Sequence, residues 1–88
     1  LKTYEILAAG SLVVMPLSEE KYIKKIGLYN LKNCYLIDFN KNIGDQINYI
    51  FNNIELFKKI RYNGYIHAKT NLTLEKEINR VRNLIENL

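Results

Sequence analysis

The segment that decides the fold is Lys2–Val14, which reads KTYEILAAGSLVV. Its first eight residues are good helix formers, and Gly10 stands where a left-handed residue commonly ends a helix. The run Leu12–Met15 is apolar and is closed by Pro16, a pattern typical of a strand buried on both faces in a parallel sheet. The segment therefore predicts a helix over 2–9 that turns at Gly10 into a buried strand.

Downstream of Pro16, the order of a helix followed by a strand is repeated once. Ser18 is a plausible N-cap with acidic residues behind it, so a short helix is expected to run to about Ile26, where Gly27 begins a break. The run Cys34–Phe39 is again apolar and rich in β-formers, which predicts a second strand.

Three further helices are predicted towards the C-terminus. In the first, apolar residues recur on one helical face: Ile43, Ile47, Ile50, Phe51 and Ile54. The third is predicted to start at an N-cap, Thr73, and to carry an apolar stripe spaced 4, 3, 4 and 3: Leu74, Ile78, Val81, Ile85 and Leu88.

Between them, a second helix is expected over Glu55–Lys69, with Leu56, Phe57 and Ile60 facing inward. Gly64 stands in its middle. Because a mid-helix glycine costs about 1 kcal/mol relative to alanine, this position predicts close packing against another backbone.

Strands that alternate with helices predict an α/β fold with a parallel sheet, here two short parallel strands with several helices. A chain of 88 residues forms at most one small domain, 1–88. Two strands, however, leave edges of unpaired backbone groups. The sequence therefore predicts the C-terminal half of a Rossmann-like, doubly wound domain.

The composition is that of a globular protein, with 48% apolar and 25% charged residues. The net charge is +4, but the basic residues are scattered among acidic ones and no nucleic-acid motif accompanies them, so they indicate solvated helix faces. No apolar run approaches the ~20 residues of a transmembrane segment. The lone Cys34 allows no intramolecular disulfide and indicates a small buried hydrophobe. No signal peptide is visible, so a reducing, cytoplasmic setting is expected.

The block Glu5–Val14, EILAAGSLVV, resembles the Glu-(Ala/Ile)-(Leu/Met)-Ala-(Cys/Ala)-Gly-x-(apolar)₃ signature of GT-B glycosyltransferases. In particular it is similar to group-1 enzymes of the spore-maturation-like type. The resemblance extends in order over almost all 88 residues, although only this block is specific. The later matches are the segment after the strand, the second strand, two helices and the start of the terminal helix: Pro16–Glu20, Tyr35–Phe39, Ile43–Asn53, Ile60–Tyr65 and Thr73–Glu75.

The resemblance implies that Glu5 holds the ribose hydroxyls of a nucleotide diphosphate sugar donor, with the helix start near the phosphates. The chemistry of the residues agrees, because a helix N-terminus offers free N–H groups to a diphosphate and a carboxylate can accept two hydrogen bonds from a ribose diol. Lys2 and Thr3 would add a cation and a hydroxyl to the first turn. Substrate binding is thus expected at Glu5, Lys2 and Thr3.

The chain also departs from the family. Many relatives have Arg where Lys2 stands, and lysine keeps the charge but lacks the bidentate fork. A second acidic residue that contacts the sugar falls before residue 1 in related enzymes. The N-terminal acceptor domain and the first strands of the donor domain are missing as well. The expected protein is therefore part of a hexosyltransferase-type enzyme, with no catalytic residue, cofactor or metal site in this part.

Two other candidate residues point to structural roles. His67 has no cysteine or acid at ligand spacing, and Asp38 belongs to an Asp-Phe-Asn turn. Two alternatives to the glycosyltransferase stay open. The first is a non-catalytic small α/β or helical protein-interaction module that uses the 74–88 stripe, and the second, weaker one is a basic nucleic-acid binder.

Overall fold

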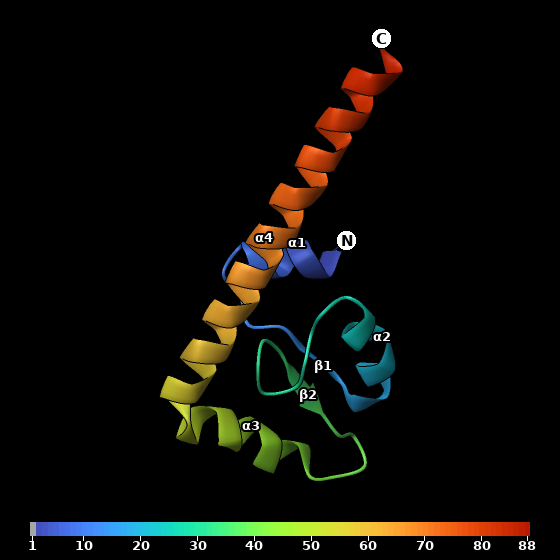
Figure 1. The fold of residues 1–88 in the computed structure, drawn as a ribbon. Coiled ribbons are helices and arrows are strands. Elements are labelled where there is room, and N and C mark those ends of the chain that lie inside the picture. Colours follow the sequence, from blue (N-terminus) through green and yellow to red (C-terminus); the bar gives the residue numbers. More distant parts are fainter. Residues whose placement is uncertain (1) are drawn as a thin grey trace.

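The structure is a computed structural model that describes residues 2–88, apart from the side chains of Lys2 and Tyr4. Helices dominate, and two short strands lie between them (Figure 1). In chain order the elements are α1 (Lys2–Ala8), β1 (Val14–Pro16), the 3-10 turn η1 (Leu17–Glu19), α2 (Glu20–Lys25), β2 (Tyr35–Ile37), α3 (Ile43–Asn52) and α4 (Ile54–Glu86).

The two strands form a parallel pair. Val14 lies opposite Tyr35, and the register continues to Pro16 opposite Ile37, with α2 in the connection between the strands. The predicted α/β class, with two short parallel strands and several helices, is thereby confirmed.

The turn from α1 into β1 depends on Gly10, which has a φ of +85°. The amide of Gly10 donates to the carbonyl of Leu7 at 2.9 Å, and that of Ser11 donates to Ile6 at 3.3 Å. These two bonds form a Schellman cap, which satisfies carbonyl groups at the end of the helix. The left-handed glycine predicted at this position is confirmed.

The start of α2 differs from the prediction. Ser18 lies inside η1 instead of capping a helix, and α2 begins at Glu20 with no side-chain cap bond. The reason is that Pro16 leads directly into the 3-10 turn, which supplies the first turn of backbone bonds and leaves no N-cap position for Ser18.

Strand β2 is buried on both faces. One face joins a cluster made by α1, α2 and α4: Leu7, Val13, Ile23, Leu28, Cys34, Leu36 and Ala68. The other face packs on the first turns of α4: Tyr35, Ile37, Phe57 and Ile60. Strand β1 is not enclosed in this way, since Val14 is 43% exposed. The two-sided burial predicted for the first strand is therefore wrong for β1 within the described residues, and it is β2 that is enclosed.

Helix α4 is one continuous helix of 33 residues, where two helices were predicted. Thr73 is an exposed residue in its interior and caps nothing. The segment from Lys69 to Thr73 contains neither glycine nor proline, so nothing in it breaks the helix. Asn71 supports the continuity, because its side-chain amide donates to the carbonyl of His67, one turn back, at 2.8 Å.

Gly64 is a point of close approach between α4 and the rest of the molecule. A Cβ atom there would lie 2.7 Å from Leu7 Cδ2 and 2.8 Å from the carbonyl oxygen of Asn33. The predicted close backbone packing at Gly64 is confirmed. Phe57 and Ile60 face inward as predicted, whereas Leu56 is exposed.

The loop 26–34, between α2 and β2, is fixed by asparagine amides. Asn33 is buried; its Oδ1 accepts from the amide of Tyr29 at 2.7 Å, and its Nδ2 donates to the carbonyl of Gly27 at 3.0 Å. Asn63 of α4 donates to the carbonyl of Lys32 at 2.9 Å. These side-chain bonds satisfy backbone groups of the loop that have no partner in a helix or a strand.

Two apolar faces are left uncovered. The predicted face of α3 is mostly exposed, at Ile43, Ile47 and Phe51. The C-terminal half of α4 extends beyond the body of the molecule (Figure 1). As a result, the predicted stripe on that half of the helix faces solvent.

Candidate functional site

The predicted donor-binding residues lie on α1, a helix of seven residues. Thr3 is half-buried and lines a hollow of about 250 Å³ between α1 and β1, together with Ile6 and residues 12–15. Glu5 is exposed. Residues two apart point to nearly opposite sides of a helix, so Thr3 and Glu5 do not share a surface. The side chain of Lys2 lies outside the described residues.

The carboxylate of Glu5 is available to a ligand as far as the described residues show. The ion pairs among them join other acids to lysine or arginine: Glu20 to Lys24, Glu55 to Lys58, and Glu77 to Arg80. None of these cations is within pairing distance of Glu5. An exposed carboxylate of this kind can accept hydrogen bonds from a diol.

A second hollow, of about 290 Å³, lies at the carboxyl ends of the two strands. Parallel α/β folds commonly bind ligands at this edge. Its lining comes from the last residue of β2 and from the segments that follow the two strands: Ile37, Leu17, Ser18, Asp38, Phe39 and Asn40.

Asp38 is committed to local structure at this edge. Its Oδ1 accepts from the amide of Asn40 at 2.9 Å, which is the turn predicted from the Asp-Phe-Asn sequence. Gln46 of α3 adds two bonds, because its Oε1 accepts from the Asp38 amide at 2.7 Å and its Nε2 donates to the Asp38 carbonyl at 2.8 Å. Sequence reasoning missed Gln46, since a glutamine on a helix carries no signal that identifies such a distant backbone partner.

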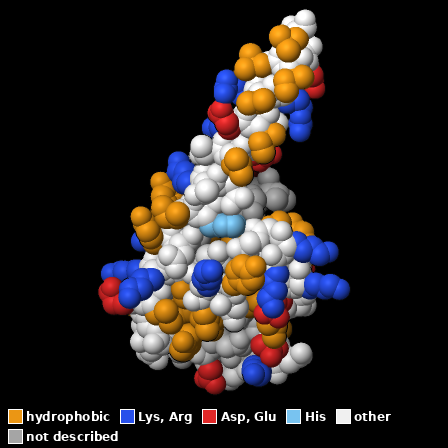
Figure 2. Space-filling model, viewed as in Figure 1, with side chains coloured by type: hydrophobic (Ala, Val, Ile, Leu, Met, Phe, Trp, Pro, Cys, Tyr) orange, Lys and Arg blue, Asp and Glu red, His pale blue; other side chains and the backbone are white. Residues whose placement is uncertain are grey.

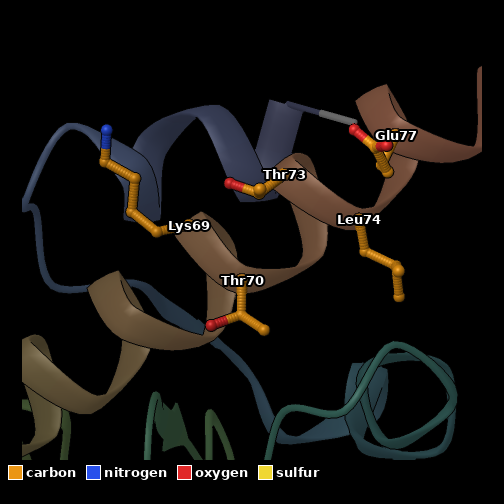
Figure 3. Close-up of a pocket in the computed structure, with 5 residues that line it drawn as sticks. All are labelled: Lys69, Thr70, Thr73, Leu74 and Glu77. Atoms are coloured by element: carbon orange, nitrogen blue, oxygen red, sulfur yellow. The ribbon is translucent and has the colours of Figure 1, made fainter. Parts of the chain in front are cut away.

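A third hollow, of about 550 Å³, lies along the middle of α4 (Figure 3). The described residues that line it lie on α4 at helical spacing: Lys69, Thr70, Thr73, Leu74 and Glu77. In the close-up, Lys69 and Thr73 extend on the side where α1 passes, and Thr70 and Leu74 extend on the opposite side (Figure 3).

The remaining reactive side chains serve the fold. Burial, and to a smaller extent the charge of Glu20, raises the pKa of the Cys34 thiol to about 11, so the fully buried sulfur stays protonated at neutral pH. Nε2 of His67 lies 2.9 Å from the carbonyl oxygen of Ile26, which agrees with the structural role predicted for this histidine. Within residues 2–88, no three His, Cys, Asp or Glu side chains are grouped to hold a metal ion.

The charged side chains are dispersed on the face shown in Figure 2, where lysines and arginines alternate with acids and apolar patches. None of the helices in the described part of the chain combines the length and apolar character needed to cross a bilayer. No protein-family model, curated protein or solved structure matches the chain.

Proposed function

We propose that the chain is the C-terminal part of a Rossmann-like GT-B donor domain, and that the complete enzyme transfers a sugar from a nucleotide diphosphate sugar to an acceptor. The observation that carries this proposal is the connection of α1, through the Gly10 cap, to an edge strand of a parallel sheet. The sequence of that connection, Glu5–Val14, is also the segment with the specific resemblance.

The uncovered surfaces around β1 support the same proposal. Val14 is 43% exposed and Ile6 of α1 is 46% exposed. Contiguous apolar surface on a small protein commonly marks an interaction site. In the proposed enzyme, this surface is covered by the first strands of the donor domain, and the N-terminal acceptor domain lies beyond them.

Within the site, Glu5 holds the ribose of the donor, because its exposed carboxylate can accept from both hydroxyls. Lys2 and the free amides of the first turn of α1 stand near the diphosphate. Thr3 lies on the other side of the helix and would meet the donor only through the hollow between α1 and β1.

The contribution of this part to the reaction is binding and charge stabilisation. As the sugar leaves, negative charge develops on the diphosphate, and a helix start with a nearby cation lowers its energy. The acceptor site and the general base belong to the missing domain. We place the reaction in the cytoplasm, a reducing compartment in which a lone thiol such as Cys34 persists.

A titration followed by NMR tests the proposal. The chain, extended by its natural upstream sequence, is titrated with uridine diphosphate and guanosine diphosphate. We expect one of the two to shift the amide signals of residues 2–11. Glu5→Gln should weaken binding about tenfold, since it removes charge-assisted hydrogen bonds. Glu19→Gln, an exposed carboxylate on η1, is the matched control and should bind normally. Absence of binding to the extended chain, or equal weakening by both variants, would reject the proposal.

The uncovered half of α4 favours a second candidate function, a non-catalytic protein-interaction module. The stripe residues from Leu74 to Leu88 are exposed, and the hollow along α4 borders them. This candidate predicts association through α4 and no response to either nucleotide, so the same titration separates the two functions.

A further inference from the structure

The C-terminal half of α4 carries an apolar seam that the described residues leave exposed. Every residue of this seam, called the α4 stripe, is at least 42% exposed: Leu74, Ile78, Val81, Ile85 and Leu88. Apolar side chains can be seen along the projecting helix in Figure 2. Their spacing of 4, 3, 4 and 3 is that of the a and d positions of a coiled coil, in which a second helix covers the seam.

The structure assigns the α4 stripe to a second copy of this chain, paired with the first in antiparallel orientation. This inference goes beyond the interaction module by naming the occupant, and it does not depend on nucleotide binding. It follows from the position of the body, the layers that the stripe forms with itself, and the charges beside it.

The body of the molecule excludes a parallel partner. Continued towards the N-terminus, the same spacing passes Asn71 and then falls on His67 and Gly64. Both are covered by the loop 26–34, since His67 Nε2 lies 2.9 Å from the carbonyl oxygen of Ile26 and a Cβ at Gly64 would lie 2.8 Å from that of Asn33. A partner helix running parallel would meet this loop. An antiparallel partner extends past the far end of α4, so the two bodies lie at opposite ends.

The stripe is self-complementary in this orientation. With the twofold axis between residues 79 and 80, Leu74 of one copy lies opposite Ile85 of the other, and Ile78 lies opposite Val81. Symmetry repeats both layers. Each of these layers joins an a position to a d position, so leucine, isoleucine and valine side chains can interlock over the central part of the seam. The same axis places Leu88 opposite Asn71 at each end.

The charges beside the seam fit the same arrangement. In an antiparallel pair, the e position of one helix lies beside the e position of the other, which places Glu75 of one copy next to Arg82 of the second. Neither residue has an ion-pair partner within the described residues. In a parallel pair Arg82 would instead lie beside Glu77, which is already paired with Arg80 of its own helix. Such rim charges add little affinity but select the orientation.

The pairing needs little additional ordering. Isolated helices of this length are marginal in water, but residues 74–86 continue a helix that is anchored in the core at Phe57 and Ile60. The seam is only about 22 Å long, so the interface is small. We therefore expect a dissociation constant in the micromolar range, about 1–100 µM.

Sedimentation equilibrium of the whole chain between about 5 and 500 µM tests the inference over the range of this affinity. We expect a monomer–dimer equilibrium. Ile78→Lys should raise the dissociation constant at least about thirtyfold, because symmetry places two lysines in the seam. Asn79→Lys adds the same charge to the same turn but outside the seam, and should leave the constant almost unchanged. Circular dichroism should show equal helix content in both variants.

Charge exchange tests the orientation. Glu75→Arg and Arg82→Glu should each weaken the dimer several-fold, and the double variant should restore it. Restoration by Glu77→Arg with Arg82→Glu would indicate a parallel pair and overturn the inference. A monomer at every concentration, or equal weakening by Ile78→Lys and Asn79→Lys, would overturn it as well. The inference would also be overturned if the protein were monomeric and a segment upstream of it protected residues 74–86 from amide exchange. None of these outcomes bears on the nucleotide titration.

Discussion

At the scale of single residues, Gly64 is the point where α4 passes α1 and the loop before β2. Its neighbours are one flexible methyl group, Leu7 Cδ2 at 2.7 Å, and one fixed atom, the Asn33 carbonyl oxygen at 2.8 Å, both measured from an added Cβ. The methyl group can move aside, but the carbonyl is held by the bonds that fix the Asn33 side chain. The glycine is therefore required by packing.

We predict that Gly64→Ala destabilises the protein although alanine is the better helix former. The gain in helix propensity is at most about 1 kcal/mol, whereas overpacking against a fixed backbone atom costs about 1–3 kcal/mol. Urea denaturation should show a net loss of about 1–2 kcal/mol in the free energy of unfolding. The exposed Asn79→Ala, which changes propensity alone, should show a small gain. Equal gains in both variants would contradict the packing argument.

Cys34 predicts a dependence of stability on pH. Its pKa rises from 9.0 to about 11 in the folded state because the thiol is buried and, to a smaller extent, because Glu20 is near. As pH increases, the unfolded chain loses this proton first. The stabilisation is therefore complete below pH 9 and is lost as pH rises through about 11.

The measurement is the free energy of unfolding of the wild type and of Cys34→Ala, from pH 8 to about pH 11. The advantage of the wild type should shrink by about 1–2 kcal/mol over this range. Alanine does not ionise, so the variant removes the contribution of other groups that titrate above pH 9. Two pH profiles that stay parallel would show that the buried thiol does not contribute.

At the scale of elements, α4 shows what a sequence pattern can and cannot predict. The apolar repeats on both sides of residue 70 correctly indicated helix. Threonine is a good N-cap, which favours a break at Thr73, but a cap preference has no effect where the preceding residues also remain helical. Without a glycine or proline between residues 69 and 73, continuation was the better prediction.

The substitution Thr73→Ala distinguishes one helix from two. In a continuous helix this exposed threonine costs about 0.5 kcal/mol relative to alanine, so the substitution should increase the helicity of residues 73–86. An N-cap threonine would give the opposite sign, a loss of about 1 kcal/mol. Circular dichroism and amide exchange measure the change, and Thr70→Ala, one turn earlier, should have the same sign.

Strand β1 illustrates a different limit. Its apolar run correctly predicted a strand, but two-sided burial depends on neighbours that the run itself does not specify. The helical repeat also determines which side chains lie on the same surface. Thr3 and Glu5 are close in sequence, but they lie on nearly opposite sides of α1 because they are two residues apart. The candidate site could thus be predicted as a set of residues, whereas its geometry could not.

At the scale of the whole molecule, the protein is elongated. Its dimensions are 58 × 25 × 15 Å, with a radius of gyration of 16.0 Å. A compact domain of this length has a radius of gyration of about 12 Å. The difference arises because α4 continues beyond the core, so much of the apolar surface of the chain lies outside any single cluster.

Small-angle X-ray scattering should detect this shape and its change on association. At the lowest concentration we expect a radius of gyration near 16 Å. The antiparallel dimer overlaps only along the two projecting helices, so its longest dimension should reach roughly 90 Å. Bodies lying side by side would leave the longest dimension close to 58 Å and contradict the arrangement.

The Asn63–Gly64 pair has one more consequence, for the chemical ageing of the protein. An asparagine that precedes glycine deamidates readily, because the unhindered glycine nitrogen attacks the side-chain carbonyl and closes a succinimide ring. Here α4 fixes the backbone, and the Asn63 amide is held by the carbonyl of Lys32 at 2.9 Å. Ring closure must therefore await the opening of this part of α4. The carboxylate that then appears at position 63 cannot donate a hydrogen bond to the carbonyl of Lys32. Deamidation at this position therefore marks the molecules in which this part of α4 has opened.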